Sequence, residues 1–261
     1  MICRFIDTHC HFDFPPFSGD EEASLQRAAQ AGVGKIIVPA IEAENFARVQ
    51  ALAEKYQPLY AALGLHPGML EKHSDVSLDQ LQQALERRPA KVVAVGEIGL
   101  DYYWLKTPEE RANSRDFFDA QLSLAEELNL PAIVHDRDAH RDCLDIVRAH
   151  PKVTGVYHCY SGGVEDAKIL MKLGWMISFT GSITFKNARR ALEVIDLLPM
   201  DRIMIETDSP YLSPEPFRGR RNDSGRVHLV AEAIARVKGM DPEEAARITL
   251  ENGTRFFRIE F

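Results

Sequence analysis

Short apolar runs alternate with helical patterns along the whole 261-residue chain. The runs predict eight strands, at residues 3–8, 35–40, 59–63, 92–95, 132–134, 153–157, 175–179 and 202–205. Strands that alternate with helices form parallel sheets, and eight such units are typical of a closed barrel. We therefore expect a single-domain α/β protein, a TIM-like (β/α)8 barrel over residues 1–261, with a doubly wound open sheet as the alternative.

Helical patterns follow each run, near residues 20–31, 44–55, from 77 onward, and at 107–128, 139–149, 164–173, 187–197, 227–237 and 241–256. Thr107 followed by Pro108 and Glu110 predicts a helix start with an N-cap, a proline at N1 and a glutamate at N3. Ser77 and Gln80 are interpreted as a second capping box, which would begin the helix near Ser77.

Residues that can bind metal ions stand where several predicted strands end. His9 and His11 follow the first strand, and their i, i+2 spacing directs both imidazoles to one side. The fourth, fifth, sixth and eighth strands are followed by one ligand-type residue each, namely Glu97, His135, His158 and Asp208. Barrel enzymes carry their active sites at this end of the strands. The sequence thus predicts four imidazoles and two carboxylates at one mouth.

Six candidate ligands exceed the three or four that one zinc ion takes from a protein. Two divalent cations about 3.5–4 Å apart use them better, with Glu97 as the bridge because it lies midway between the ligands of strands one and five. Glu97 and Asp208 are the candidate catalytic residues. Asp208 can transfer a proton, or cap the turn that precedes Pro210. Zinc, manganese and magnesium all remain open.

The composition of the chain limits the kinds of molecule that the protein is expected to bind. A net charge of −8 argues against a broad basic face for duplex DNA, although a few local phosphate contacts remain compatible with it. The four cysteines show no C-x-x-C spacing, and we expect free thiols in a cytoplasmic protein. We expect no signal peptide, because Arg4 interrupts the only early apolar run, and no membrane partner, because no run reaches the ~18 apolar residues of a membrane helix. No obligate protein partner is evident.

Five motifs together resemble the TatD family of metal-dependent deoxyribonucleases, within the amidohydrolase superfamily. They are Asp7-Thr8-His9-Cys10-His11, Gly64-Leu65-His66-Pro67, the segments 96–101 and 158–162, and Glu206-Thr207-Asp208-Ser209-Pro210-Tyr211-Leu212. The resemblance implies a TIM-like barrel with two divalent cations. It implies that His9 and His11 hold one ion near Asp208, that His135 and His158 hold the other, and that Glu97 bridges. The implied reaction is hydrolysis of a phosphodiester at the 3′ end of DNA.

Four further residues are candidate substrate contacts. The resemblance makes His66 a substrate or outer-sphere residue, and a cap on Pro67 is the alternative. Arg218, Arg220 and Arg221 form a short basic run after strand eight. If that loop folds over the mouth, the guanidinium groups could hold phosphate oxygens in bidentate pairs; otherwise the run is a solvated loop.

Three functions remain open at this point. The leading one is a phosphodiesterase that acts on DNA ends or another small phosphodiester. The second keeps the metal centre but hydrolyses an amide, ester or lactone, since a fold does not fix a reaction. The third is a non-catalytic metal-binding barrel, which would require an incomplete ligand set.

Overall fold

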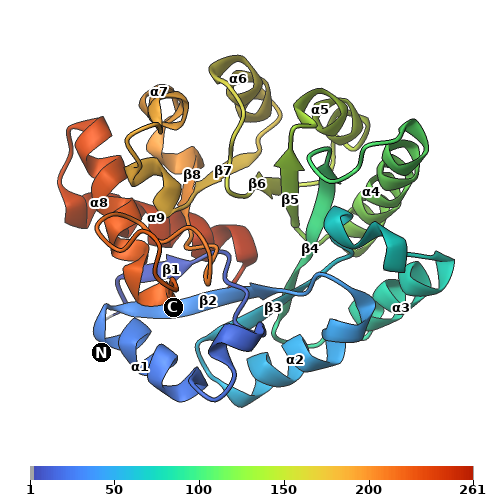
Figure 1. The fold of residues 1–261 in the computed structure, drawn as a ribbon, viewed down its shortest axis with the longest axis horizontal. Helices are drawn as coiled ribbons and strands as arrows, with labels where there is room; N and C mark the ends of the chain where they lie inside the picture. Colours follow the sequence, from blue (N-terminus) through green and yellow to red (C-terminus); the bar gives the residue numbers. More distant parts are fainter. Residues whose placement is uncertain (1–2, 261) are drawn as a thin grey trace.

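A computed structural model describes residues 3–260. Eight strands form one sheet in chain order, and each neighbouring pair is parallel. They are β1 (Phe5–Asp7), β2 (Val33–Pro39), β3 (Leu59–Leu63), β4 (Val92–Asp101), β5 (Ala132–Arg137), β6 (Gly155–Tyr157), β7 (Met176–Phe179) and β8 (Ile203–Ile205). The ribbon shows helices placed around the strands (Figure 1). The predicted (β/α)8 barrel is confirmed, and the open doubly wound sheet is excluded.

The helices follow the predicted alternation. They are α1 (Glu21–Gln30), α2 (Phe46–Lys55), α3 (Asp75–Glu86), α4 (Pro108–Leu128), α5 (His140–Ala149), α6 (Val164–Lys172), α7 (Arg189–Leu197), α8 (Val227–Lys238) and α9 (Pro242–Phe257). The predicted start of α4 is confirmed, because the Glu110 N–H donates to Thr107 Oγ1 at 3.1 Å and Glu110 Oε2 accepts from the Thr107 N–H at 2.9 Å.

The predicted start of α3 is wrong by about one turn. Ser74, not Ser77, is the N-cap. The Ser77 N–H donates to Ser74 Oγ at 3.3 Å, and Ser77 Oγ accepts from the Ser74 N–H at 2.8 Å. Serine thus replaces the usual glutamate or glutamine at N3 of the capping box, so the sequence pattern did not reveal it.

The barrel interior is filled by one apolar layer. Every strand contributes to it, β4 with two residues and each other strand with one, namely Ile6, Ile37, Ala62, Val93, Ala94, Ile133, Val156, Met176 and Met204. Leu250 and Phe257 of α9 pack against this layer. Asn252 Nδ2 donates to the carbonyl of Ile203, the first residue of β8, at 2.8 Å. Helix α9 therefore covers the end where the strands begin and leaves the opposite end for a site.

The barrel closes through the segments that follow β8 and β1. The Thr8 N–H donates to the Ile205 carbonyl at 3.2 Å, and the Asp208 N–H donates to the His9 carbonyl at 2.9 Å. Cys10 and Ser209 form an isolated parallel bridge. These contacts bring the residue that follows the last strand against the histidines that follow the first.

Strand β4 is longer than the predicted run at 92–95, and this changes the position of Glu97. The pairing of β4 with β5 is irregular between Val95 and Ile98, then continues with Gly99 beside His135 and ends at Asp101. Gly99 has a φ of +131°, and a Cβ there would lie 2.0 Å from the His135 carbonyl oxygen. Glu97 and His135 consequently lie within strands, not after them as the sequence suggested.

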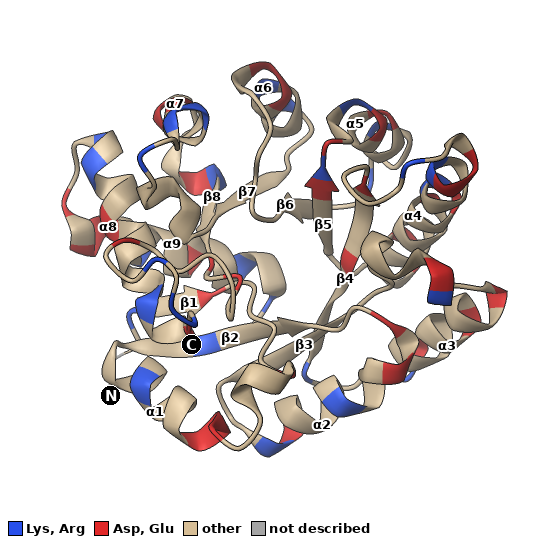
Figure 2. Ribbon diagram, in the orientation of Figure 1, with Lys and Arg blue, Asp and Glu red and all other residues tan. Residues whose placement is uncertain are grey.

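Charges of both signs are interspersed over the outer helices (Figure 2), so the ribbon shows no extended basic track. None of the helices in residues 3–260 has the length and apolar character that crossing a bilayer requires. All four cysteines are free, as predicted.

Candidate metal centre

The predicted site residues meet at the end of the barrel where the strands finish. Five of the six line one cavity of about 680 Å³, and His9 lies beneath it with no exposed surface. The parallel sheet produces this arrangement, because all eight strands finish at the same end. The imidazoles and carboxylates then point inward from β1, β4, β5, β6 and β8.

The first group of ligand atoms comes from the segments after β1 and β8. The Nε2 atoms of His9 and His11 lie 3.4 Å apart. Asp208 Oδ1 lies 3.4 Å from His11 Nε2 and 3.9 Å from His9 Nε2. Burial alone would lower the pKa of His11, but the hydrogen bond with Asp208 and the negative charges of Glu97, Asp208 and Asp13 together outweigh burial and raise the pKa.

The second group comes from β5 and the residue after β6. His135 Nδ1 and His158 Nε2 lie 3.2 Å apart. Each of them lies 2.8 Å from Glu97 Oε1. Burial would lower the pKa of the His158 imidazole, but the charges and hydrogen bonds of Glu97 and Glu206 together outweigh burial and raise the pKa well above its ordinary value.

Glu97 lies between the two groups and directs one oxygen to each. Its Oε2 lies 3.2 Å from His9 Nε2 and 3.7 Å from His11 Nε2, whereas its Oε1 faces His135 and His158. Burial would raise the pKa of this carboxyl, but the surrounding imidazoles outweigh burial and hold the pKa well below its usual range. Glu97 is therefore a buried carboxylate that can bridge two cations.

The donor atoms fit divalent cations. Within residues 3–260, Glu97 Oε2 is buried and has no hydrogen-bond partner. Two pairs of imidazole nitrogens face each other at 3.2 and 3.4 Å, so four ring nitrogens converge on the two sides of Glu97. Cations would satisfy these atoms: His9, His11 and Asp208 would hold one, His135 and His158 the other, and Glu97 would join them.

Two carboxylates that the sequence analysis did not select support the second group. Asp101 Oδ2 lies 3.0 Å from His135 Nε2. Glu206 Oε1 lies 3.3 Å from His158 Nδ1 and accepts from the Cys159 N–H at 2.6 Å. Both contact the ring nitrogen that faces away from Glu97, as carboxylates commonly do behind metal-binding histidines. Both residues belong to motifs that the sequence showed, and Glu206 precedes Asp208 by two positions.

His66 is the cap that the sequence offered as an alternative, and its ring also contacts Glu97. Its Nδ1 accepts from the Gly68 N–H at 2.9 Å, at the start of the 3-10 helix Pro67–Lys72. A backbone N–H can only donate, so the proton of the neutral ring is on Nε2. That nitrogen lies 3.2 Å from Glu97 Oε1 at the cavity wall. His66 is therefore a hydrogen-bond donor at the mouth, and its protonated Nε2 is not free to bind a metal.

The three arginines of the basic run lie beside the mouth, not in it. They line a neighbouring cavity that shares Tyr211 and Leu212 with the mouth. Arg221 pairs with Asp20 and donates to the Pro16 carbonyl at 2.7 Å, and the Arg218 guanidinium lies 4.3 Å from the centre of the Phe185 ring. Arg220 is exposed. Their predicted role as substrate contacts remains a prediction.

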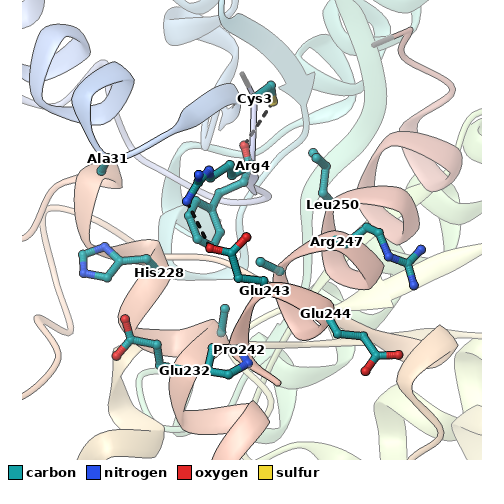
Figure 3. A pocket seen from close by; sticks show the side chains of 13 residues that line it. Cys3, Arg4, Ala31, His228, Glu232, Pro242, Glu243, Glu244, Arg247 and Leu250 are labelled. Atoms are coloured by element: carbon teal, nitrogen blue, oxygen red, sulfur yellow. Dashed lines mark hydrogen bonds and ion pairs between the residues drawn. The ribbon is translucent and has the colours of Figure 1, made fainter. Parts of the chain in front are cut away.

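A larger cavity, of about 800 Å³, lies elsewhere, between the segment before β1 and helices α8 and α9 (Figure 3). Its charged groups include the exposed pair of Arg4 and Glu243, whose Nη1 and Oε1 atoms lie 3.2 Å apart. No group of potential metal ligands found in residues 3–260 lies there. We therefore assign the chemistry to the smaller cavity at the mouth.

A parallel barrel with histidines and carboxylates gathered where its strands end defines a class, the metal-dependent hydrolases built on TIM-like barrels. The family model described as TatD related DNase matches residues 6–258. The chain belongs to the TatD family and is a metal-dependent hydrolase of that family.

Relatives resemble the chain over its full length. A protein of Escherichia coli K12 named uncharacterized metal-dependent hydrolase YjjV is 55% identical over 261 residues, which cover 99% of this chain and 100% of that protein. The hydrolase YabD of Bacillus subtilis 168, likewise named uncharacterized, is 40% identical and covers 97% of this chain and 99% of its own. The crystal structure of the TatD homologue YjjV superposes with a TM-score of 0.94 at 53% identity, with 100% of both chains covered.

Proposed function

We propose that this protein is a two-metal phosphodiesterase that hydrolyses DNA from its 3′ ends. The observation that carries the proposal is the position of Glu97, whose two carboxylate oxygens face two separate groups of ligand atoms. Paired divalent cations supply an activated water and stabilise charge on a phosphate. The description of the family as DNase-related supports the same reaction.

Two side chains of the protein can assist the reaction, Asp208 by accepting a proton and His66 by donating a hydrogen bond. Burial would raise the pKa of Asp208, but its hydrogen bond with His11 and the charges of the neighbouring imidazoles together outweigh burial and lower the pKa, so Asp208 is ionised near neutral pH. An ionised carboxylate can accept the proton that an attacking water loses. His66 presents an N–H at the cavity wall, where it can donate to a phosphate oxygen as negative charge develops.

Replacing His66 with alanine tests whether this residue donates a hydrogen bond to the substrate and is not a metal ligand. We expect the metal content to stay at the wild-type level, because the His66 nitrogen that faces Glu97 carries a proton. Turnover of a phosphodiester should fall by about 10²-fold, the cost of losing one donor to developing charge. Elemental analysis and steady-state kinetics on the same preparation measure the metal content and the turnover. A His66→Ala protein that lacks one ion would identify His66 as a ligand instead.

The contact with DNA should be confined to the strand end. The net charge of −8 and the interspersed surface charges leave only local cationic groups near the mouth (Figure 2). The logarithm of the binding constant should therefore fall with the logarithm of salt concentration with a slope that reports about two to four phosphates, at ~0.7 each for a single strand. A slope equivalent to eight or more phosphates would contradict local contact.

A further inference from the structure

Exposed aromatic side chains lie at the mouth or directly beside it. In residues 3–260 four large apolar residues are exposed, and three of them are aromatic: Tyr103 (44%), Trp104 (63%) and Tyr211 (54%). Trp104 and Tyr211 line the same cavity as the candidate metal centre. Single exposed apolar residues need no explanation, but exposed aromatic rings grouped at a cavity indicate a binding surface.

The backbone that carries the rings beyond β4 is bound to Asp101, which also contacts a histidine of the candidate metal centre. The backbone N–H groups of Tyr103 and Trp104 donate to Asp101 Oδ1 at 3.0 and 3.3 Å, and Asp101 Oδ2 lies 3.0 Å from His135 Nε2. The Tyr103 ring meets the Trp104 ring edge to face, with 4.8 Å between the ring centres. The Arg137 guanidinium, from the end of β5, lies 3.9 Å from the centre of the Tyr103 ring. We call Tyr103, Trp104 and Arg137 the aromatic rim.

Arg137 is the one lysine or arginine among the described residues that line this cavity. Its side chain is exposed, and within residues 3–260 it forms no ion pair with a carboxylate within 4 Å. Arg221, in contrast, is already paired with Asp20. A guanidinium group without a carboxylate partner, placed beside a cavity, is suited to bind a phosphate.

We infer that the aromatic rim is a nucleotide subsite, in which Trp104 stacks on a base of the strand end and Arg137 binds a phosphate of the same strand. The inference rests on the proposed phosphodiesterase function and restricts its substrate to a strand that carries bases. Stacking on an exposed ring requires an unstacked base, so single-stranded ends are preferred over duplex ends. Every base has a π-face, so sequence preference should be weak.

Intrinsic fluorescence offers a direct test, because the chain has only two tryptophans. Trp104 is exposed, whereas Trp175 is 1% exposed and serves as the internal reference. The protein is titrated with single-stranded oligothymidylate and with an abasic oligomer of equal length, in excess EDTA so that no hydrolysis occurs. We expect the base-carrying strand to quench part of the emission and the abasic strand to leave it unchanged.

Variants of Trp104 separate stacking from a structural role. Trp104→Ala should weaken binding of oligothymidylate about 5- to 100-fold, within the range measured for loss of one aromatic platform. Trp104→Phe should restore most of the affinity but no longer show the quench. Equal quenching by the abasic strand, or unchanged affinity in Trp104→Ala, would overturn the subsite. Self-association of the wild-type protein that Trp104→Ala abolishes would assign the rim to a second copy of the chain instead.

Arg141 is a control for Arg137, because its exposed side chain lies on α5 outside the cavity, where its Nε is 3.9 Å from Asp145 Oδ2. Both Arg137→Gln and Arg141→Gln remove one positive charge. Only Arg137→Gln should lower the salt slope, by ~0.7 for one phosphate on a single strand. Equal slopes in the two variants would overturn the phosphate contact.

The subsite and the proposed function can fail separately. Quenching by oligothymidylate without phosphodiester hydrolysis by the metal-loaded protein would leave the subsite standing and remove the proposed function. Hydrolysis with equal kcat/KM for base-carrying and abasic ends would support the function and overturn the subsite.

Discussion

Replacement of Glu97 by alanine is expected to weaken metal binding at both positions of the centre. Its two oxygens face different groups of histidines, so one substitution removes a ligand from each. Loss of an outer carboxylate behind a metal ligand costs about 10–100-fold in affinity, and loss of a direct bridge should cost more. Elemental analysis and metal titration of the reconstituted protein measure both sites.

Two variants serve as controls for Glu97→Ala. His135→Ala removes a ligand from the second group only and should lower the affinity of mainly one ion. Glu97→Gln keeps the shape of the side chain and one ligand oxygen, so it separates loss of the bridge from a packing defect in this buried position. A wild-type protein that never takes up more than one ion per chain would count against the bridged pair.

Asp208→Asn should reduce turnover roughly 10²–10⁴-fold while most of the metal remains, if Asp208 transfers the proton. The amide keeps the shape of the side chain and one oxygen toward His11, but it no longer has a basic carboxylate. The structure places the Asp208 N–H on the His9 carbonyl at 2.9 Å, so the side chain is anchored beside the first group of ligands. Kinetics and metal analysis of the same sample measure the two effects.

If Asp208 serves only as a metal ligand, the Asp208→Asn variant should show a different combination of metal content and activity. If Asp208 only positions an ion, metal content and activity should fall together in Asp208→Asn, and added metal should restore activity. Near-normal turnover with a full complement of metal would rule out the acid–base role.

Much of the barrel and of its centre could be predicted from the sequence, because each buried parallel strand is a short apolar run that stops where the polar site begins. His9, His11, His158 and Asp208 follow such stops, and the structure brings them together. The position of Glu97 could not be predicted. Its strand passes through an irregular pairing with β5 and continues for four more residues, and such a register shift depends on contacts between strands.

The supporting carboxylates were missed for a related reason. Asp101 and Glu206 act through the far nitrogens of His135 and His158, so their importance depends on ring orientations that a strand pattern does not specify. The contacts of the basic run after β8 likewise depend on the fold, and its role in binding substrate remains a prediction. Three nearby arginines suggested phosphate contacts, yet Arg221 is held by Asp20 of the α1 N-cap, which lies some two hundred residues earlier in the chain.

End-labelled, single-stranded DNA incubated with the metal-loaded protein tests the proposed function most directly. The assay compares a 5′-labelled strand with a free 3′ end against simple phosphodiester, amide and lactone substrates. We predict stepwise shortening from the 3′ end that EDTA abolishes and added divalent metal restores. Intact DNA in the presence of a fully loaded centre, together with hydrolysis of an amide or a lactone, would contradict the phosphodiesterase and assign this centre to a different bond.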